Sequence, residues 1–211
     1  MITAFPPLDY AEPESGLLAV GGDLEVESLE LAYRSGIFPW PHREGEILWF
    51  APPQRGILEF KDLHIPRRLQ RHLKKAAFTF RMNTNFESVI HQCAASRHRG
   101  PGQGTWITRQ MLDAYIAFHA AGFAKSFEAY NESGKLVGGM YGVQIDRYFA
   151  GESMFYLETN ASKFALLKAI EHFQENGLTW MDIQMETPLL KTFGAREISR
   201  DAFMEKLSKT L

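Results

Sequence analysis

Acidic and amide side chains interrupt two otherwise hydrophobic segments in the second half of the chain. Alternation along 179–185 places Asp182 and Gln184 on one face of a strand and hydrophobic residues on the other. In 148–156, Glu152 lies among aromatic and small residues in the same way. If the two strands are neighbours, two carboxyls and an amide meet in an aromatic setting, which is typical of a site that binds an amine and manages its proton. An exposed edge strand is the alternative interpretation of the Asp182 and Gln184 pair.

A run of basic residues in the middle of the chain is the second feature with an evident chemistry. Residues 61–110 contain 10 basic and 2 acidic residues, whereas residues 1–60 contain 3 and 10. Pro66 suits the first turn of a helix, and hydrophobic residues recur at a spacing of four. Cations on the opposite face repel one another, which predicts a polyanionic partner such as nucleic-acid phosphates; a solvated helix face is the alternative. These cations are Arg67, Arg68, Arg71, Lys74 and Lys75.

Two groups of secondary-structure elements are expected to position these residues. Residues 1–60 combine short strands and turns with one helix near 28–35, which predicts a small N-terminal α/β domain. Residues 61–211 contain longer elements, and their antiparallel strands lead into a strand, helix, strand unit. This order is typical of an α+β domain with helices packed on a sheet. We expect helices after Pro66 and over 86–96, 108–121 and 162–176, and strands over 125–130, 135–144, 147–156 and 178–185.

The composition narrows the class of protein. The 211 residues are 45% hydrophobic and 23% charged, close to the globular average. No hydrophobic run approaches the roughly 18 to 20 residues that span a bilayer, and the first residues lack the pattern of a signal peptide. We therefore expect a soluble, cytoplasmic protein without a membrane partner. Cys93 is the only cysteine, which excludes an internal disulfide, and the seven histidines show no metal-binding spacing, so no metal is expected.

Several sequence blocks in a fixed order give the chain a resemblance to a known family. Each block alone is a weak signal, whereas all of them in order are highly specific. The blocks are GLLAVGGDL at 16–24, GIFPW at 36–40, GTWITR at 104–109, LVGGMYG at 136–142, GESMF at 151–155 with NASK at 160–163, and DIQ at 182–184. Through them the chain resembles the bacterial leucyl/phenylalanyl-tRNA-protein transferases over nearly its whole length.

The resemblance implies a fold and an activity. It implies a small N-terminal domain over 1–60 and a catalytic domain over 61–211 with an acyl-CoA N-acyltransferase-like fold, a mixed sheet flanked by helices. It implies transfer of Leu or Phe, and sometimes Met, from aminoacyl-tRNA to the α-amine of proteins that begin with Arg or Lys. Such transfer marks the protein for degradation by the N-end rule. No cofactor, metal or membrane is implied.

The resemblance also implies roles for particular residues. Gln184 would contact the attacking amine and Asp182 would polarise it through Gln184, while Glu152 and Asp182 would attract the basic side chain of the acceptor. The exposed cations after Pro66 would bind tRNA. The aminoacyl side chain would occupy a pocket of unbranched and aromatic residues, namely Trp40, Trp106, Met140, Phe149, Phe173 and Met181.

The chain departs from the family pattern at three positions. Thr187 and Leu189 stand where the family usually has Asn and His, which affects the expected preference for donor or acceptor. Ala169 replaces a Phe of the pocket wall, which is expected to enlarge the pocket. Two other functions remain as alternatives. The pattern R-x-x-G-x-G over 97–102 is also found in CoA-dependent N-acetyltransferases, and the substitutions at 187 and 189 would suit a tRNA-binding protein without turnover.

Overall fold

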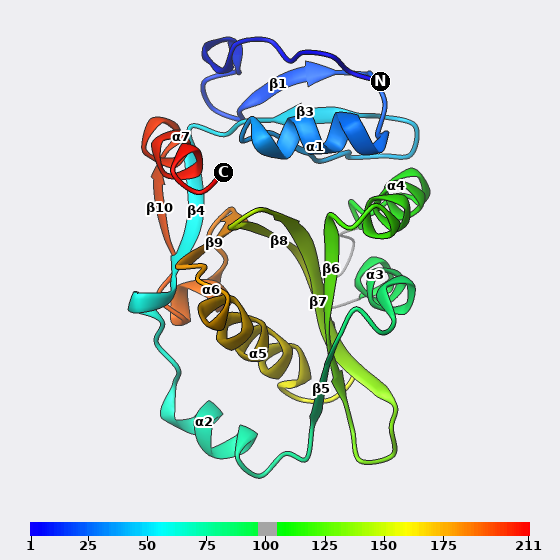
Figure 1. Cartoon of the computed structure of the whole chain (residues 1–211), viewed down its shortest axis with the longest axis vertical. Helices are drawn as coiled ribbons and strands as arrows, with labels where there is room; N and C mark the ends of the chain where they lie inside the picture. The colour runs from blue at the N-terminus through cyan, green and yellow to red at the C-terminus, as the bar shows by residue number, and fades with distance from the viewer. Residues whose placement is uncertain (97–104) are drawn as a thin grey trace.

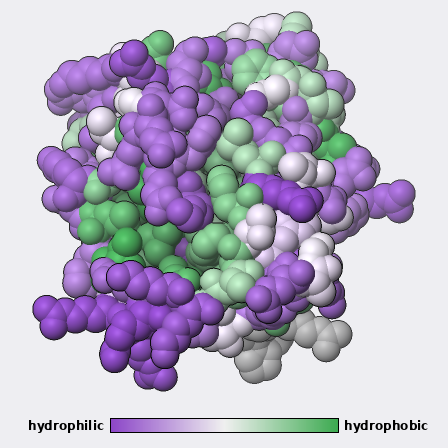
Figure 2. All heavy atoms as spheres, turned by 60° about the horizontal axis from the view of Figure 1, so that its bottom comes forward, coloured by the Kyte–Doolittle hydropathy of each residue, from purple (hydrophilic) through white to green (hydrophobic). Residues whose placement is uncertain are grey.

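The structure, a computed structural model, describes residues 1–96 and 105–211. Within these ranges the strands form a three-stranded sheet of order β1-β3-β2 and a seven-stranded sheet of order β10-β4-β9-β8-β7-β6-β5. The small sheet and helix α1 lie at one end of the molecule, and the large sheet with its helices forms the remainder (Figure 1). Hydrophobic side chains also gather in a hollow of the surface, with hydrophilic side chains around it (Figure 2).

The small sheet is antiparallel and is built from β1 (Leu17–Val20), β2 (Phe38–Pro39) and β3 (Leu48–Phe50). Helix α1 (Val26–Arg34) packs beside it. The short 3-10 helix η1 (Leu8–Tyr10) precedes β1 in the chain. Trp49 is fully buried and contacts the ring of Phe5 at a centroid distance of 5.0 Å. Trp40, one residue after β2, faces a cavity that residues of the large sheet also line.

The large sheet is mixed, since its only parallel pairing among the described strands joins β8 to β9. The predicted meander is confirmed as β6, β7 and β8, and the predicted strand over 178–185 is confirmed as the shorter β9. The sequence did not predict the short strands β4, β5 and β10, of which β4 precedes residue 61. The strands are β4 (Gln54–Glu59), β5 (Thr79–Met82), β6 (Ala124–Tyr130), β7 (Leu136–Ile145), β8 (Tyr148–Tyr156), β9 (Trp180–Gln184) and β10 (Arg196–Ser199).

Helices cover both faces of the large sheet. Helix α5 lies on one face, and α3 and α4 lie on the other, beside β6 and β7 (Figure 1). The sheet with flanking helices confirms the predicted α+β class. The division into two domains at residue 60 stays a prediction. Strand β4, which precedes residue 60, belongs to the large sheet. The helices are α2 (Arg67–Leu73), α3 (Phe86–Ala95), α4 (Arg109–Ala120), α5 (Ala161–Glu175), α6 (Pro188–Thr192) and α7 (Arg200–Ser208), with the 3-10 helix η2 (Phe60–Asp62).

The parallel pair brings the polar residues of two strands together. Parallel neighbours need a crossover connection, which α5 supplies between β8 and β9. Ala150 in β8 is opposite Asp182 in β9. Because parallel strands advance in the same direction, Glu152 and Gln184, each two residues further along, come side by side. The topology thus places the two polar interruptions of the sequence at one point of the sheet.

Candidate active site

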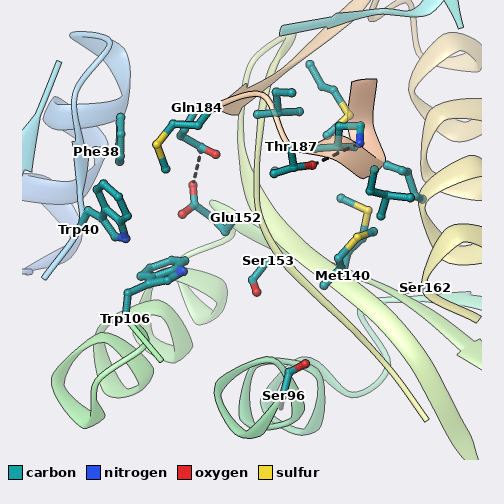
Figure 3. A pocket seen from close by; sticks show the side chains of 18 of the residues that line it. Phe38, Trp40, Ser96, Trp106, Met140, Glu152, Ser153, Ser162, Gln184 and Thr187 are labelled. Carbon is teal, nitrogen blue, oxygen red and sulfur yellow. Dashed lines mark hydrogen bonds between the residues drawn. The ribbon is translucent and has the colours of Figure 1, made fainter. Parts of the chain in front are cut away.

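A cavity of about 490 Å³ opens at this point of the sheet. Its walls come from β2, from the segment before α4, and from β8, α5, β9 and α6. Aromatic side chains of the small sheet and of position 106 face the carboxyl and the amide across the cavity (Figure 3). Hydrophobic residues supply most of the remaining wall. The residues that line it include Phe38, Trp40, Trp106, Met140, Leu166, Met181, Ile183, Leu189 and Leu190.

Glu152 and Gln184 form a hydrogen-bonded pair in the wall of this cavity. Gln184 Nε2 donates to Glu152 Oε1 at 3.1 Å, and the two side chains point toward one another (Figure 3). Tyr33 of α1 donates its hydroxyl to the same carboxylate oxygen at 2.8 Å, and Tyr115 of α4 is hydrogen-bonded to Tyr33. Since Gln184 Nε2 is engaged by the carboxylate, Gln184 Oε1 remains the acceptor that the amide can offer to a substrate.

The burial of Glu152 changes its protonation. Burial is the main reason that the pKa of Glu152 is raised to about 8. The nearby Asp182 carboxylate acts in the same direction, whereas the hydrogen bond from Tyr33 and the charge of Arg55 oppose the rise in this pKa. A carboxyl with a pKa near that of an α-amine, about 8, is matched to exchange a proton with one.

Asp182 is fully buried, and other protein groups occupy its oxygens. Arg55 of β4 donates Nε to Oδ1 at 2.9 Å and Nη2 to Oδ2 at 2.7 Å, and the Tyr148 hydroxyl donates to Oδ2 at 2.5 Å. The backbone N–H of Gln184 donates to Oδ1 at 2.8 Å. Asp182 therefore meets Gln184 at its backbone, and no contact joins its carboxylate to the side-chain amide among the described hydrogen bonds.

The backbone at Gln184 has a conformation that a non-glycine residue rarely adopts. Its φ is 55°, and the N–H of Met185 donates to the carbonyl of Ile183 at 2.6 Å, which closes a γ-turn around it. Such a turn with a left-handed central residue is strained and persists only where surrounding contacts enforce it. The bond from Gln184 N–H to Asp182 is one such contact. The turn directs the Gln184 side chain toward Glu152.

Gly56 allows this turn to lie against β4, and its replacement is a first test. A Cβ at Gly56 would lie 2.8 Å from the Met185 carbonyl carbon and 2.9 Å from the Glu186 nitrogen. We expect Gly56→Ala to displace the turn and lower stability by about 1 to 3 kcal/mol, together with kcat. Thermal unfolding and steady-state kinetics measure the two effects. Gly134→Ala is the matched control, because a Cβ there meets nothing within 4 Å and only the hairpin backbone is strained; an equal loss of kcat in both variants would contradict the assignment.

The structure separates the six predicted pocket residues into two groups. Trp40, Trp106, Met140 and Met181 line the cavity. Phe149 and Phe173 do not border it, because both are fully buried in the core cluster behind Met140 and Met181. Ala169 belongs to the same buried cluster. Ala169 is not among the residues that line the cavity. Replacement of a Phe by Ala at this position therefore changes the packing of the core behind the cavity wall.

The two other departures from the family pattern do border the cavity. Thr187 and Leu189 both line it at the start of α6. The hydroxyl of Thr187 accepts from the N–H of Leu190 at 3.2 Å and so begins the helix. Together with Leu189 and Leu190, it gives this wall a hydrophobic surface with a single hydroxyl.

The predicted basic helix is present, although shorter than the run of basic residues. Leu69 of α2 is buried in the core, and all five cations are exposed. None of the five takes part in an ion pair with a described residue. The glycine-rich segment 97–102, on which the CoA interpretation depends, overlaps residues 97–104 and lies outside the described residues.

The residues that the structure adds to the site are Arg55 and three tyrosines. Arg55 is the single cation of the strand QRGILE, and a charge inside a hydrophobic strand was a signal that could have identified it. Tyr33, Tyr115 and Tyr148 carry no comparable signal, because buried tyrosines are common in cores. Burial raises the pKa of all three phenols well above the usual value, so they donate hydrogen bonds as neutral groups.

The described residues show neither a metal cluster nor a membrane span. In this part of the chain, no group of three or more His, Cys, Asp or Glu side chains is arranged to hold a metal ion. Within residues 1–96 and 105–211, none of the helices has both the length and the hydrophobicity that crossing a bilayer requires.

Family models match both parts of the chain. The model described as leucyl/phenylalanyl-tRNA protein transferase matches residues 57–208, and the model for the N-terminal domain of the same family matches residues 22–53.

Curated relatives carry the same name. A leucyl/phenylalanyl-tRNA–protein transferase of Anaeromyxobacter sp. (strain K) is 48% identical over 208 residues, which cover 99% of this chain and 88% of the relative. One from Maridesulfovibrio salexigens is 45% identical over 208 residues, covering 98% and 85%. Among solved structures, that of FemX is similar with a TM-score of 0.48 and 11% identity, covering 82% of this chain and 66% of FemX.

Proposed function

The chain belongs to the leucyl/phenylalanyl-tRNA protein transferase family, and we propose that it acts on proteins that begin with Arg or Lys. It is an aminoacyltransferase that moves an amino acid from aminoacyl-tRNA to a protein. The proposal extends this activity to Leu and Phe as the preferred donors, with Met as a weaker one, and to cytoplasmic N-end rule degradation as the fate of the product. Support for the donors comes from the hydrophobic cavity that ends at the Glu152 and Gln184 pair.

The cavity suits a large, uncharged side chain. Its volume of about 490 Å³ and its wall of Trp, Met, Leu and Ile side chains favour burial of an aliphatic or aromatic group. An anionic donor side chain would lose its hydration beside the Glu152 carboxyl, without a cation among the described residues that line the cavity. Because one methylene changes binding by only about 1 to 3 kcal/mol, we expect Leu, Phe and Met to be sorted loosely.

The reaction is aminolysis of an ester. The acceptor's α-amine nitrogen attacks the aminoacyl carbonyl carbon, the new C–N bond forms, and the bond to the ribose oxygen breaks. The amine loses a proton, and the ribose oxygen gains one as it leaves. The ester is already activated, so positioning and proton transfer are the main tasks of the protein.

We assign these tasks to the residues of the pair. Glu152 accepts the proton of the attacking amine, since its raised pKa is close to that of the amine, and passes it to the leaving ribose oxygen. Gln184 orients the amine through Oε1 because its Nε2 is bonded to Glu152. Asp182 is enclosed by Arg55, Tyr148 and the Gln184 backbone, so its proposed role is to fix the turn.

A panel of purified substrates tests the proposal. Aminoacyl-tRNAs carrying labelled Leu, Phe, Met, Ala or Lys are combined with peptides that differ only in the first residue. We expect transfer from Leu and Phe to peptides that begin with Arg or Lys, and none to the same peptides with an acetylated α-amine. Equal transfer to peptides that begin with Ala or Glu would contradict the acceptor assignment. Retention of tRNA without any transfer by the folded protein would favour the binding-protein alternative, and saturable binding of acetyl-CoA in calorimetry would favour the acetyltransferase.

The exposed cations of α2 give a prediction about tRNA. We expect the double variant Arg67→Ala and Arg71→Ala to weaken association with different tRNAs to a similar extent, because phosphate contacts carry no sequence information. The slope of log K against log salt should fall in magnitude by about 1.4 to 1.8, since two contacts of about 0.7 to 0.9 each are lost. Binding titrations at several salt concentrations measure it. Lys209→Ala, which removes an exposed cation directly after α7, is the control; an unchanged slope in the double variant would remove α2 from the interface.

A further inference from the structure

Arg55 occupies an unusual position behind the cavity. Its side chain is 2% exposed, and its guanidinium carbon lies 4.5 Å from the ring centre of Phe38 and 4.6 Å from that of Phe203. Nη1 donates to the carbonyl of Gly36 at 3.1 Å, and the remaining bonds go to Asp182. The guanidinium thus joins the small sheet, the large sheet and helix α7 at one point.

The contacts of Arg55 continue to two sides of the cavity. Phe38, which stacks on the guanidinium, lines the cavity on the side of the small sheet. Asp182, which receives the paired bonds of Arg55, accepts the backbone N–H of Gln184, and the Gln184 side chain lines the cavity on the side of the large sheet. Neither Arg55 nor Asp182 lines the cavity itself.

We propose that Arg55 is a positioning residue of the transfer reaction, which sets the Gln184 amide relative to the aromatic wall through Asp182 and Phe38. The inference rests on the role proposed for Gln184 in the transfer. It explains why a strained γ-turn persists at residue 184: the carboxylate that holds its N–H is itself held at both oxygens. It also explains why an arginine occupies this place, because a planar fork makes two parallel bonds to a carboxylate and packs on aromatic rings.

Arg55→Lys is the main test, because it keeps the charge and removes the fork and the stacking. We expect kcat to fall about 30-fold, as displacement of a reacting group by about 1 Å produces losses of this order, while KM for aminoacyl-tRNA changes less than about threefold. Arg200→Lys is the control, since Arg200 lies near β4 but is only partly buried, and among the described hydrogen bonds its side chain donates only to the Ala51 carbonyl. Its kcat should stay at the wild-type value.

A double-variant cycle separates positioning from general damage to the fold. In a Gln184→Ala background the amide is absent, so Arg55→Lys should lower kcat by less than about threefold. If Arg55→Lys has the same effect with and without Gln184, Arg55 acts by another route and the inference is wrong, although the transferase function stands. If Gln184→Ala alone leaves kcat unchanged, the role proposed for Gln184 and the inference both fail.

Tyr148→Phe provides a second variant that removes a single hydroxyl. It deletes one of the bonds that hold Asp182 and leaves the Arg55 pair in place. We expect kcat to fall about fivefold with KM unchanged, and the effect should again disappear in the Gln184→Ala background. If Arg55→Lys does not fold, the Tyr148→Phe cycle tests whether the contacts of Asp182 position Gln184. An unchanged kcat for Tyr148→Phe overturns the inference.

Discussion

Replacement of Glu152 by Gln is expected to lower kcat about 10³-fold at about pH 7.5, within the usual range for loss of a general base. The substitution keeps the size of the side chain and an oxygen that can accept from Tyr33 and Gln184. It removes the group that accepts the amine proton. Single-turnover transfer of labelled Phe to an Arg-started peptide measures the effect. A decrease of less than tenfold would mean that another group or solvent takes the proton.

The pH dependence gives a sharper form of the same prediction. Because the pKa of Glu152 is raised to about 8, the carboxylate is the minor form at neutral pH and increases as pH rises toward 8. The acceptor's α-amine becomes neutral in the same range, at about pH 7.7 to 8.0. Below this range the logarithm of kcat/KM for the acceptor should therefore rise with a slope of about 2 in the wild type and about 1 in Glu152→Gln.

Stability offers a readout of the Glu152 pKa that does not depend on catalysis. A carboxyl whose pKa is higher in the folded chain than in the unfolded chain favours folding below the unfolded value of about 4.5. This contribution is lost between about pH 4.5 and pH 8, at a limiting slope of about 1.4 kcal/mol per pH unit. The free energy of unfolding should decline less steeply over this range in Glu152→Gln. Identical slopes in both proteins would mean that the pKa is not raised.

Replacement of Asp182 by Ala is expected to lower the free energy of unfolding by about 3 to 5 kcal/mol, the usual effect of removing one partner of a buried ion pair. The substitution leaves the Arg55 guanidinium buried without its anion. At about 2 to 4 °C per kcal/mol for a chain of this size, the midpoint of thermal unfolding should fall by about 10 °C. Calorimetry measures the shift, and kcat should fall with it because the turn at Gln184 loses its acceptor.

Two controls distinguish the buried pair from an ordinary salt bridge. Glu205→Ala removes an exposed partner of Lys209 and should change stability by less than about 1 kcal/mol. The double variant Arg55→Met and Asp182→Leu removes both buried charges and should recover much of the lost stability, because hydrophobic residues often replace buried ion pairs without a penalty. It should not recover kcat. Recovery of both would show that the pair serves only the fold.

The longer elements could be predicted from the sequence because their signals are local. The helices α3, α4 and α5 have hydrophobic residues at helical spacing, and the meander is interrupted by clear turn residues. The strands β4, β5 and β10 contain four to six residues each, and they are strands because distant segments pair with them. Pairing between distant segments does not produce a hydrophobic periodicity in the sequence of either strand.

The site was predictable where a polar residue interrupts a hydrophobic strand. Glu152, Asp182 and Gln184 were identified in this way, and the structure connects them by hydrogen bonds. The roles of neighbours were not predictable. The family resemblance assigned Phe149 and Phe173 to the pocket, but their rings contact each other in the core at a centroid distance of 4.3 Å. A resemblance in sequence does not tell which buried ring borders a cavity.

The contact of Phe203 with Arg55 has a consequence for biosynthesis. Phe203 lies in α7, and β10 just before it completes the edge of the large sheet next to β4. Translation produces both elements after the residues that line the cavity. A nascent chain still attached to the ribosome and stopped before position 200 thus lacks one of the two rings that enclose the guanidinium.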